Sequence, residues 1–136
     1  MEMHASGSFE VQMEAKTTRD DGDGIVIGEW SLEKTFSGDM VGTSKGTMLT
    51  AMTDVPGSAG YVAIERFRGT LSGRSGTFVL QHSGTTAKGD EGLSVTVVPD
   101  SATGELKGLS GRMTIEQVDG RHRYSLEYDL EQPPSA

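Results

Sequence analysis

The chain alternates between apolar and polar residues over most of its length, which is the pattern of half-buried antiparallel β-strands. In residues 4–15, Phe9, Val11 and Met13 share one face, and the polar residues between them share the other. Similar patterns predict strands over residues 25–36, 40–53, 93–99 and 105–117. Residues 16–24 and 85–92 are polar and contain glycine, so we expect both to be loops. No segment shows a helical period.

Residues 60–85 predict a β-hairpin, because two apolar runs flank the turn-forming segment Ser-Gly-Arg-Ser. We expect a four-residue loop over residues 72–75, which would place Gly69 opposite Phe78 and Glu65 opposite His82. Side chains alternate along strands, so Glu65 and His82 share a face with the apolar residues of this hairpin. The opposite face carries arginines and hydroxyl residues and belongs in water. The hairpin therefore predicts a carboxyl group and an imidazole that point into the core.

A second hairpin is predicted around the Asp-Gly dipeptide at 119–120, which favours a type I′ turn. This turn would place Ile115 opposite Tyr124 and Met113 opposite Leu126, so apolar residues pair on one face and the register is self-consistent. We expect the last strand to end near residue 130. Residues 131–136 are expected to form a frayed tail.

Eight amphipathic strands joined by short turns predict an all-β fold, namely a closed antiparallel eight-stranded barrel that is mostly an up-and-down meander. Closure removes both exposed sheet edges. The interior of such a barrel is filled by side chains or holds one small ligand. A two-sheet sandwich is the alternative, because a sequence predicts strands better than it predicts closure. The 136 residues fit one domain, 1–136, with no linker and no internal repeat.

Charge and composition narrow the set of partners. The net charge of −8 disfavours nucleic acid and also disfavours electrostatic binding to an anionic membrane. The absence of cysteine excludes disulfides, thiol catalysis and thiolate metal sites. The first residues lack a basic segment followed by an apolar run, and no apolar stretch approaches the roughly 20 residues that span a bilayer. We therefore predict no membrane partner and a cytoplasmic location.

Three stretches of the sequence resemble a known protein family: SKGTML at 44–49, GSAGYVAIERFRGTLSGRSGTFVLQHSGT at 57–85, and LSVTVVPDSATGELKGLSGRMTI at 93–115. The family is bacterial and of uncharacterised function, and its fold is similar to the allene oxide cyclase barrel. The resemblance covers nearly the whole chain except the Asp-rich loop and the Pro-containing tail. It implies an eight-stranded antiparallel barrel and self-association into a homo-oligomer. It implies no reaction, because similarity of fold alone does not transfer an activity.

The candidate site is a set of polar residues expected on the inner face: Lys34, Ser44, Tyr61, Glu65 and His82. Glu65 and His82 are the candidate catalytic residues, since a carboxylate beside an imidazole in a partly dry cavity can act as a general acid–base pair. Lys34, Ser44 and Tyr61 are candidate ligand-binding neighbours. The alternative is a buried salt-bridge and hydrogen-bond cluster that satisfies its own charges.

We predict neither a metal site nor a cofactor. The three histidines lack a closely spaced ligand partner of the His-x-His or Glu-x-x-His kind. The Asp-rich segment at 20–24 looks superficially like a calcium loop, but counting from Asp21 the twelfth position is Leu32 rather than a bidentate Glu. We interpret this segment as a solvated turn.

Three functions are compatible with these features. The preferred hypothesis is a soluble barrel that binds a small molecule in its interior near Glu65 and His82. The second is an enzyme that uses Glu65 and His82 for proton transfer, for example on a small carbonyl compound. The third is a structural protein without a ligand whose surfaces pack into a homo-oligomer.

Overall fold

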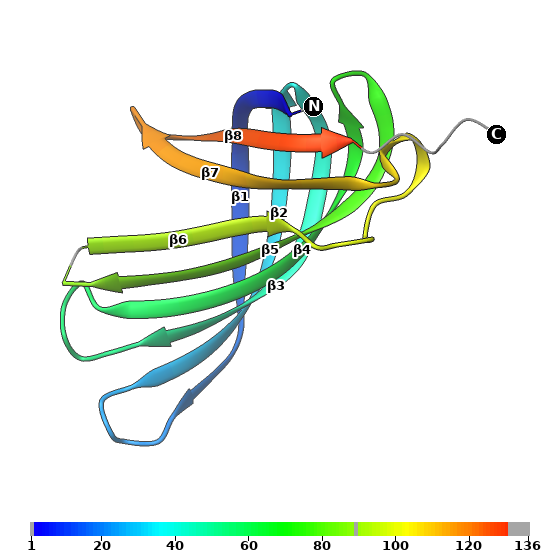
Figure 1. Ribbon diagram of the computed structural model, residues 1–136. Helices are drawn as coiled ribbons and strands as arrows, with labels where there is room; N and C mark the ends of the chain where they lie inside the picture. The colour runs from blue at the N-terminus through cyan, green and yellow to red at the C-terminus, as the bar shows by residue number, and fades with distance from the viewer. Residues whose placement is uncertain (1, 89, 131–136) are drawn as a thin grey trace.

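Eight antiparallel strands in sequence order form a closed barrel, in which the first strand also pairs with the last (Figure 1). The computed structural model describes residues 2–88 and 90–130. The strands are β1 (Met3–Asp20), β2 (Val26–Gly38), β3 (Met40–Met52), β4 (Ala59–Leu71), β5 (Arg74–Ala87), β6 (Asp90–Val97), β7 (Leu109–Val118) and β8 (Arg121–Leu130). The predicted meander barrel is confirmed, and the sandwich alternative is excluded. The predicted frayed tail, 131–136, lies outside the described residues.

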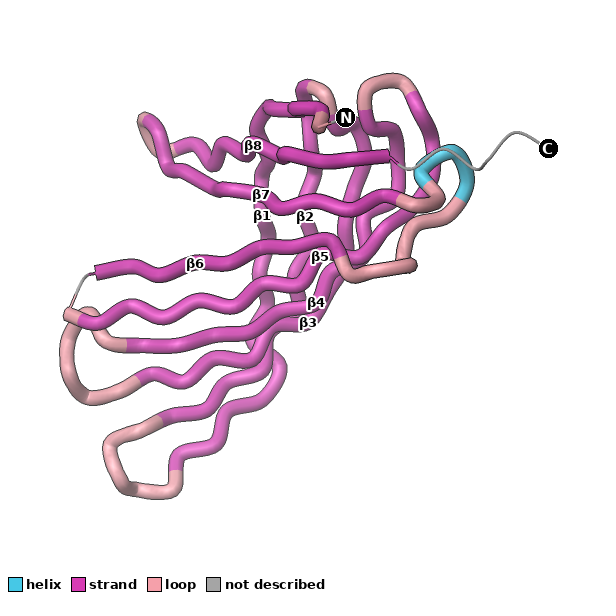
Figure 2. Tube along the Cα trace, viewed as in Figure 1, coloured by secondary structure: helices cyan, strands magenta, loops and turns pink. Residues whose placement is uncertain are grey.

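The barrel is closed unevenly along its length. Within the described residues, β6 and β7 are joined by two residue pairs, Val95 with Met113 and Thr96 with Arg112. Away from this point, β6 and the β7–β8 hairpin diverge from each other, as Figure 2 shows. Strands β1 to β5 continue as long hairpins at the same end of the molecule. The barrel therefore has an open mouth at that end.

The closed end is filled by aromatic side chains. Phe36 contacts the rings of Phe9, Phe67 and Tyr124 at centroid distances of 5.3–5.6 Å, and Phe67 contacts Phe78 at 5.0 Å. The Tyr124 hydroxyl donates to the carbonyl oxygen of Ser37 at 2.9 Å and accepts from the amide N–H of Met40 at 2.8 Å. Because these two residues flank the β2–β3 turn, Tyr124 reaches across Gly7 of β1 and ties β8 to that turn.

The β4–β5 hairpin, predicted over residues 60–85, has a shorter loop than the sequence suggested. Its loop contains two residues, Ser72 and Gly73, which both have positive φ (48° and 85°), as a type I′ turn requires. Gly69 consequently pairs with Gly76, and Glu65 pairs with Leu80 rather than with His82. The predicted four-residue loop and its pairing were therefore wrong by two residues. A shift of two preserves the side-chain faces, so the predicted inner face is retained.

Both predicted long loops are shorter in the structure. Strand β1 continues to Asp20, after a bulge between Ala15 and Thr17, because its backbone keeps pairing with β2 even where both faces are exposed. Strand β5 continues to Ala87, and β6 begins at Asp90. Polar composition was a misleading signal here, because backbone pairing needs no apolar side chains.

The second predicted hairpin is confirmed in register. Asp119 and Gly120 have positive φ, Ile115 pairs with Tyr124, and Met113 pairs with Leu126. Strand β7 begins at Leu109 rather than at residue 105, because a short 3-10 helix, η1 (Gly104–Leu106), precedes it. In the part of the chain that the structure describes, no helix is long and apolar enough to cross a membrane.

Candidate functional site

Four of the five candidate residues meet inside the barrel, one from each of four neighbouring strands. Glu65 Oε2 lies 2.8 Å from Lys34 Nζ and 3.0 Å from His82 Nε2. The Ser44 hydroxyl donates to the other carboxylate oxygen, Oε1, at 3.3 Å. All four side chains are enclosed, with exposed fractions of 7% for Lys34, 2% for Ser44, 0% for Glu65 and 3% for His82. We refer to these residues as the interior cluster.

The cluster forms because the side chain of each member points into the barrel and because β3 carries small residues on its inner face. Lys34 pairs with Ser44, and Gly46 pairs with Glu65. A Cβ atom added to Gly46 would lie 2.7 Å from the Cβ of Glu65, so the glycine makes room for the glutamate. Small residues on a strand allow a neighbour to approach closely, and here the approaching group is Glu65.

Charge balance rather than ideal hydrogen bonding stabilises the cluster. Among the described residues, neither Glu65 Oε2 nor His82 Nε2 has an aligned hydrogen-bond partner, although their contact is short. Burial is the largest influence on the carboxyl group and by itself would raise its pKa. The contact with His82 and the charge of Lys34 together outweigh burial, so the pKa of Glu65 lies below its ordinary value of 4.5. Glu65 is therefore ionised at neutral pH.

Lys34 also contacts the aromatic core. Its ammonium nitrogen lies 4.6 Å from the ring centroid of Phe9, which is a cation–π distance. The ammonium group is thus held between the carboxylate of Glu65 and the negative face of an aromatic ring. This placement explains how a lysine is accommodated on the face of β2 that also carries Leu32 and Phe36.

The fifth candidate, Tyr61, lies at the mouth of the barrel instead of in the interior cluster. It lines an open cavity of about 430 Å³, which we call the mouth cavity. The other lining residues are Met13, Met48, Thr50, Met52, Ala59, Gly60, Gly84, Thr85, Thr86, Gly92 and Leu93. Neither Glu65 nor His82 lines it, so the cavity does not open directly onto the predicted catalytic pair.

The mouth cavity and the interior cluster are nevertheless neighbours in the sheet. Met48 and His82 both pair with Ala63, and Gly84, which lines the cavity, is two residues from His82 on the same face of β5. The Trp30 indole N–H donates to the hydroxyl of Thr50 at 3.2 Å, and Thr50 is a cavity residue. Within the cluster, His82 is therefore level with the cavity residue Met48, and Glu65, Ser44 and Lys34 lie deeper in the barrel.

Sequence reasoning missed the methionines of the mouth. Met13 and Met52 are 54% and 53% exposed, although both belong to the apolar face of their strands. The position of these methionines was a usable signal. Inward side chains near the end of a hairpin are covered by less of the opposite sheet than those in the middle, so they stay more exposed. Three methionines on one concave surface give an adaptable apolar lining.

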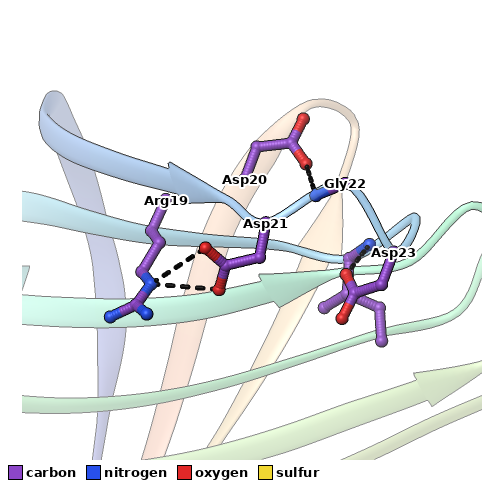
Figure 3. A network of polar contacts seen from close by, with 6 residues as sticks. Arg19, Asp20, Asp21, Gly22 and Asp23 are labelled. Atoms are coloured by element: carbon purple, nitrogen blue, oxygen red, sulfur yellow. Dashed lines mark hydrogen bonds and ion pairs between the residues drawn. The ribbon is translucent and has the colours of Figure 1, made fainter.

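The Asp-rich turn between β1 and β2 uses its carboxylates locally (Figure 3). Arg19 donates to Asp21, Asp20 accepts from the amide of Gly22 at 2.9 Å, and Asp23 accepts from the amide of Ile25 at 3.1 Å. The bonds to the amides of Gly22 and Ile25 are Asx-type turn bonds, and the contact of Arg19 with Asp21 is an exposed ion pair. Over residues 2–88 and 90–130, no group of three or more His, Asp or Glu side chains is arranged to hold a metal ion.

The fold and the site define a class of protein: a small antiparallel barrel with a buried charged cluster beneath an open apolar mouth. The chain belongs to the DUF3224 family, whose members are described as proteins of unknown function and whose model matches residues 5–128. A crystal structure of a DUF3224 protein of unknown function from Shewanella oneidensis is similar, with 42% identity and a TM-score of 0.93 over 98% of this chain and 100% of that chain. No curated protein matches the chain significantly.

Proposed function

We propose that the protein binds a small, mostly apolar molecule in the mouth cavity. The observation that carries this proposal is the cavity itself: a concave surface of about 430 Å³ lined by Met13, Met48, Met52 and Leu93, with a tyrosine at its side. Pockets that bind small molecules are concave and mainly apolar, and they have a few polar groups that orient the ligand. Tyr61 and Thr50 supply such groups here. The interior cluster lies next to the cavity but does not line it.

The resemblance to the allene oxide cyclase barrel agrees with a ligand in the barrel, and we infer this likeness of fold from the sequence stretches alone. It supports no particular reaction or ligand. The ligand class follows instead from the lining: a compact or planar apolar body with a single hydrogen-bonding group that reaches Thr50 or Tyr61.

The single tryptophan provides a direct test. The indole of Trp30 is hydrogen-bonded to Thr50, which lines the cavity. An apolar fluorophore such as N-phenyl-1-naphthylamine should therefore quench the tryptophan emission by energy transfer as the probe fills the cavity. We expect saturable binding of one probe per chain. Ala59→Phe places a ring in the cavity and should weaken binding at least about tenfold, which corresponds to about 1.4 kcal/mol. Val118→Phe, on the remote β7–β8 hairpin, is the matched control.

Two results would contradict the proposal. One is a probe signal that never saturates, and the other is equal affinity in wild type and in the folded Ala59→Phe variant.

Proton transfer by Glu65 and His82 is a second candidate function, favoured by the 3.0 Å approach of the two side chains. The imidazole would be the acting group and the ionised carboxylate its orienting partner. The test is exchange of protons alpha to the carbonyl group of small ketones and aldehydes in D₂O. His82→Ala should abolish exchange if the pair acts, while equal rates with and without wild-type protein would exclude this function.

A further inference from the structure

The outer surface of β2, β3 and β4 carries an apolar patch that faces solvent. Ile27, Leu49, Val62 and Ile64 are 45%, 47%, 51% and 50% exposed. Leu49 pairs with Val62, and Ile64 pairs with Thr47, which neighbours Leu49 on the same outer face. Ile27 pairs with Ala51, one step further along β3. The four side chains thus form one continuous patch across three strands, which we call the outer patch, and such patches mark interaction surfaces.

Charges of opposite sign flank the outer patch on its two sides. Glu29 and Glu33 lie on β2, whereas Arg66 and Arg68 lie on β4. Arg66, Arg68 and Lys45 surround a surface hollow of about 640 Å³, which is a local concentration of positive charge on a chain of net charge −8. Lys45 lies 3.9 Å from Glu33. In the described part of the chain, Arg66 and Arg68 have no carboxylate at ion-pair distance.

The strand register places these charges in matching rows. Glu33, Lys45 and Arg66 are paired across β2, β3 and β4, so they lie at one level, and Glu29, Leu49 and Val62 lie at another. A two-fold axis that runs along β3 would place β2 of one copy over β4 of the other without changing the level. Glu33 of the partner subunit would then face Arg66, and the symmetry generates the same contact a second time.

We propose that the outer patch is the interface of a homodimer with its two-fold axis along β3. Apolar burial of Ile64, Val62 and Leu49 drives association, and the pairing of Glu33 with Arg66 fixes the orientation. Leu49 meets its own copy on the axis, and Lys45, which also lies there, is 3.9 Å from Glu33 of its own chain. A polyanion is a poorer occupant of the basic hollow, because the acidic β2 and the negative net charge repel it. A second copy covers the outer patch and places opposite charges together at Glu33 and Arg66.

The oligomeric state tests this proposal first. Light scattering and analytical ultracentrifugation at tens of micromolar should show a dimer that weakens as salt is raised. Ile64→Asp should raise the dissociation constant at least about tenfold. Val118→Asp, which changes an apolar side chain of similar exposure on another face, should leave it unchanged. Circular dichroism reports whether each variant is folded.

Charge reversal tests the orientation of the two copies. Arg66→Glu alone and Glu33→Arg alone each place like charges at both contacts, so each variant should be monomeric. An equimolar mixture of the two variants restores opposite charges at both contacts and should form a heterodimer. This recovery cannot come from contacts within one chain, because mixing does not alter them.

The proposal would be overturned by a monomeric wild type at 100 micromolar or so, by a dimer insensitive to Ile64→Asp, or by the absence of a heterodimer in the mixture of folded variants. Association of the wild type with a polyanion instead of with itself would also overturn it.

Discussion

At the scale of single residues, the most informative group is the carboxylate of Glu65. It is fully enclosed, it is in contact with Lys34 and His82, and it accepts a hydrogen bond from Ser44. A buried charge is tolerated only when opposite charge and hydrogen bonds offset its loss of hydration. The interior cluster is therefore a unit whose members depend on one another more than on the surrounding apolar core.

Removing the carboxylate charge should expose this dependence. Glu65→Gln leaves the ammonium of Lys34 buried without a counter-charge, and we expect it to lower the free energy of unfolding by about 3–5 kcal/mol. The double variant Lys34→Met/Glu65→Gln removes both charges and should recover most of this loss. Urea denaturation of the two variants, the wild type and the exposed control Glu10→Gln measures the effect. Additive losses in the double variant would show that the ion pair is not the stabilising interaction.

The same group predicts how stability depends on pH. The pKa of Glu65 is lower in the folded chain than its ordinary value of 4.5, so the folded state favours the ionised form. Its contribution is complete above pH 4.5 and is lost as the pH falls through the folded pKa. The difference in unfolding free energy between wild type and Glu65→Gln should therefore shrink as the pH falls from 4.5 through the pKa of Glu65 in the folded chain. The pKa of Glu105 is also lowered, mainly by hydrogen bonds from Ser75. Both proteins contain Glu105, so its contribution to the pH dependence cancels from the difference between them. A difference that grows in acid would contradict this account.

At the scale of elements, close approach of β3 and β4 is what admits the glutamate. Gly46 lies where a Cβ would come within 2.3 Å of the carbonyl oxygen of Ile64 and 2.7 Å of the Cβ of Glu65. Neither atom can move without disturbing the β3–β4 pairing. The site thus depends on a missing side chain as much as on the polar groups that are present.

Gly46→Ala should accordingly destabilise the barrel by about 1–3 kcal/mol, because the added methyl group forces the two strands apart. Gly60→Ala is the matched control on the neighbouring strand, since its Cβ would meet no atom closer than 3.7 Å. Thermal unfolding of both variants gives the comparison. Equal midpoints for the two variants would mean that β3 can shift without cost.

At the scale of the whole molecule, the junction of β6 and β7 is the weakest part of the barrel wall. Two residue pairs join these strands among the described residues, whereas all of β6 pairs with β5 and all of β7 pairs with β8. Local opening follows the density of buried contacts and backbone hydrogen bonds, so we expect this junction to open before the rest. The open mouth and its cavity lie on the same side of the molecule as the divergence of these strands.

A disulfide across the junction tests this expectation, because the chain has no cysteine of its own. Thr96 and Arg112 are paired and exposed, and changing both to cysteine should give an oxidised form about 3 kcal/mol more stable than the reduced form. Amide hydrogen exchange in β6 should slow markedly on oxidation. Unchanged exchange rates in β6 would mean that the barrel opens elsewhere.

The sequence by itself determined the strands and their faces, since alternation with a period of two is a local property that survives errors of register. The four-residue loop assumed for the central hairpin shifted every pair by two positions, yet Glu65 and His82 remained inside. Only the tertiary structure decided which inward groups meet, because the approach of Lys34 to Glu65 across β3 depends on the curvature of the sheet and on the small residues between them. The mouth cavity was likewise a tertiary outcome: it lies at the end of the barrel where β6 diverges from the β7–β8 hairpin, and no local sequence pattern records that divergence.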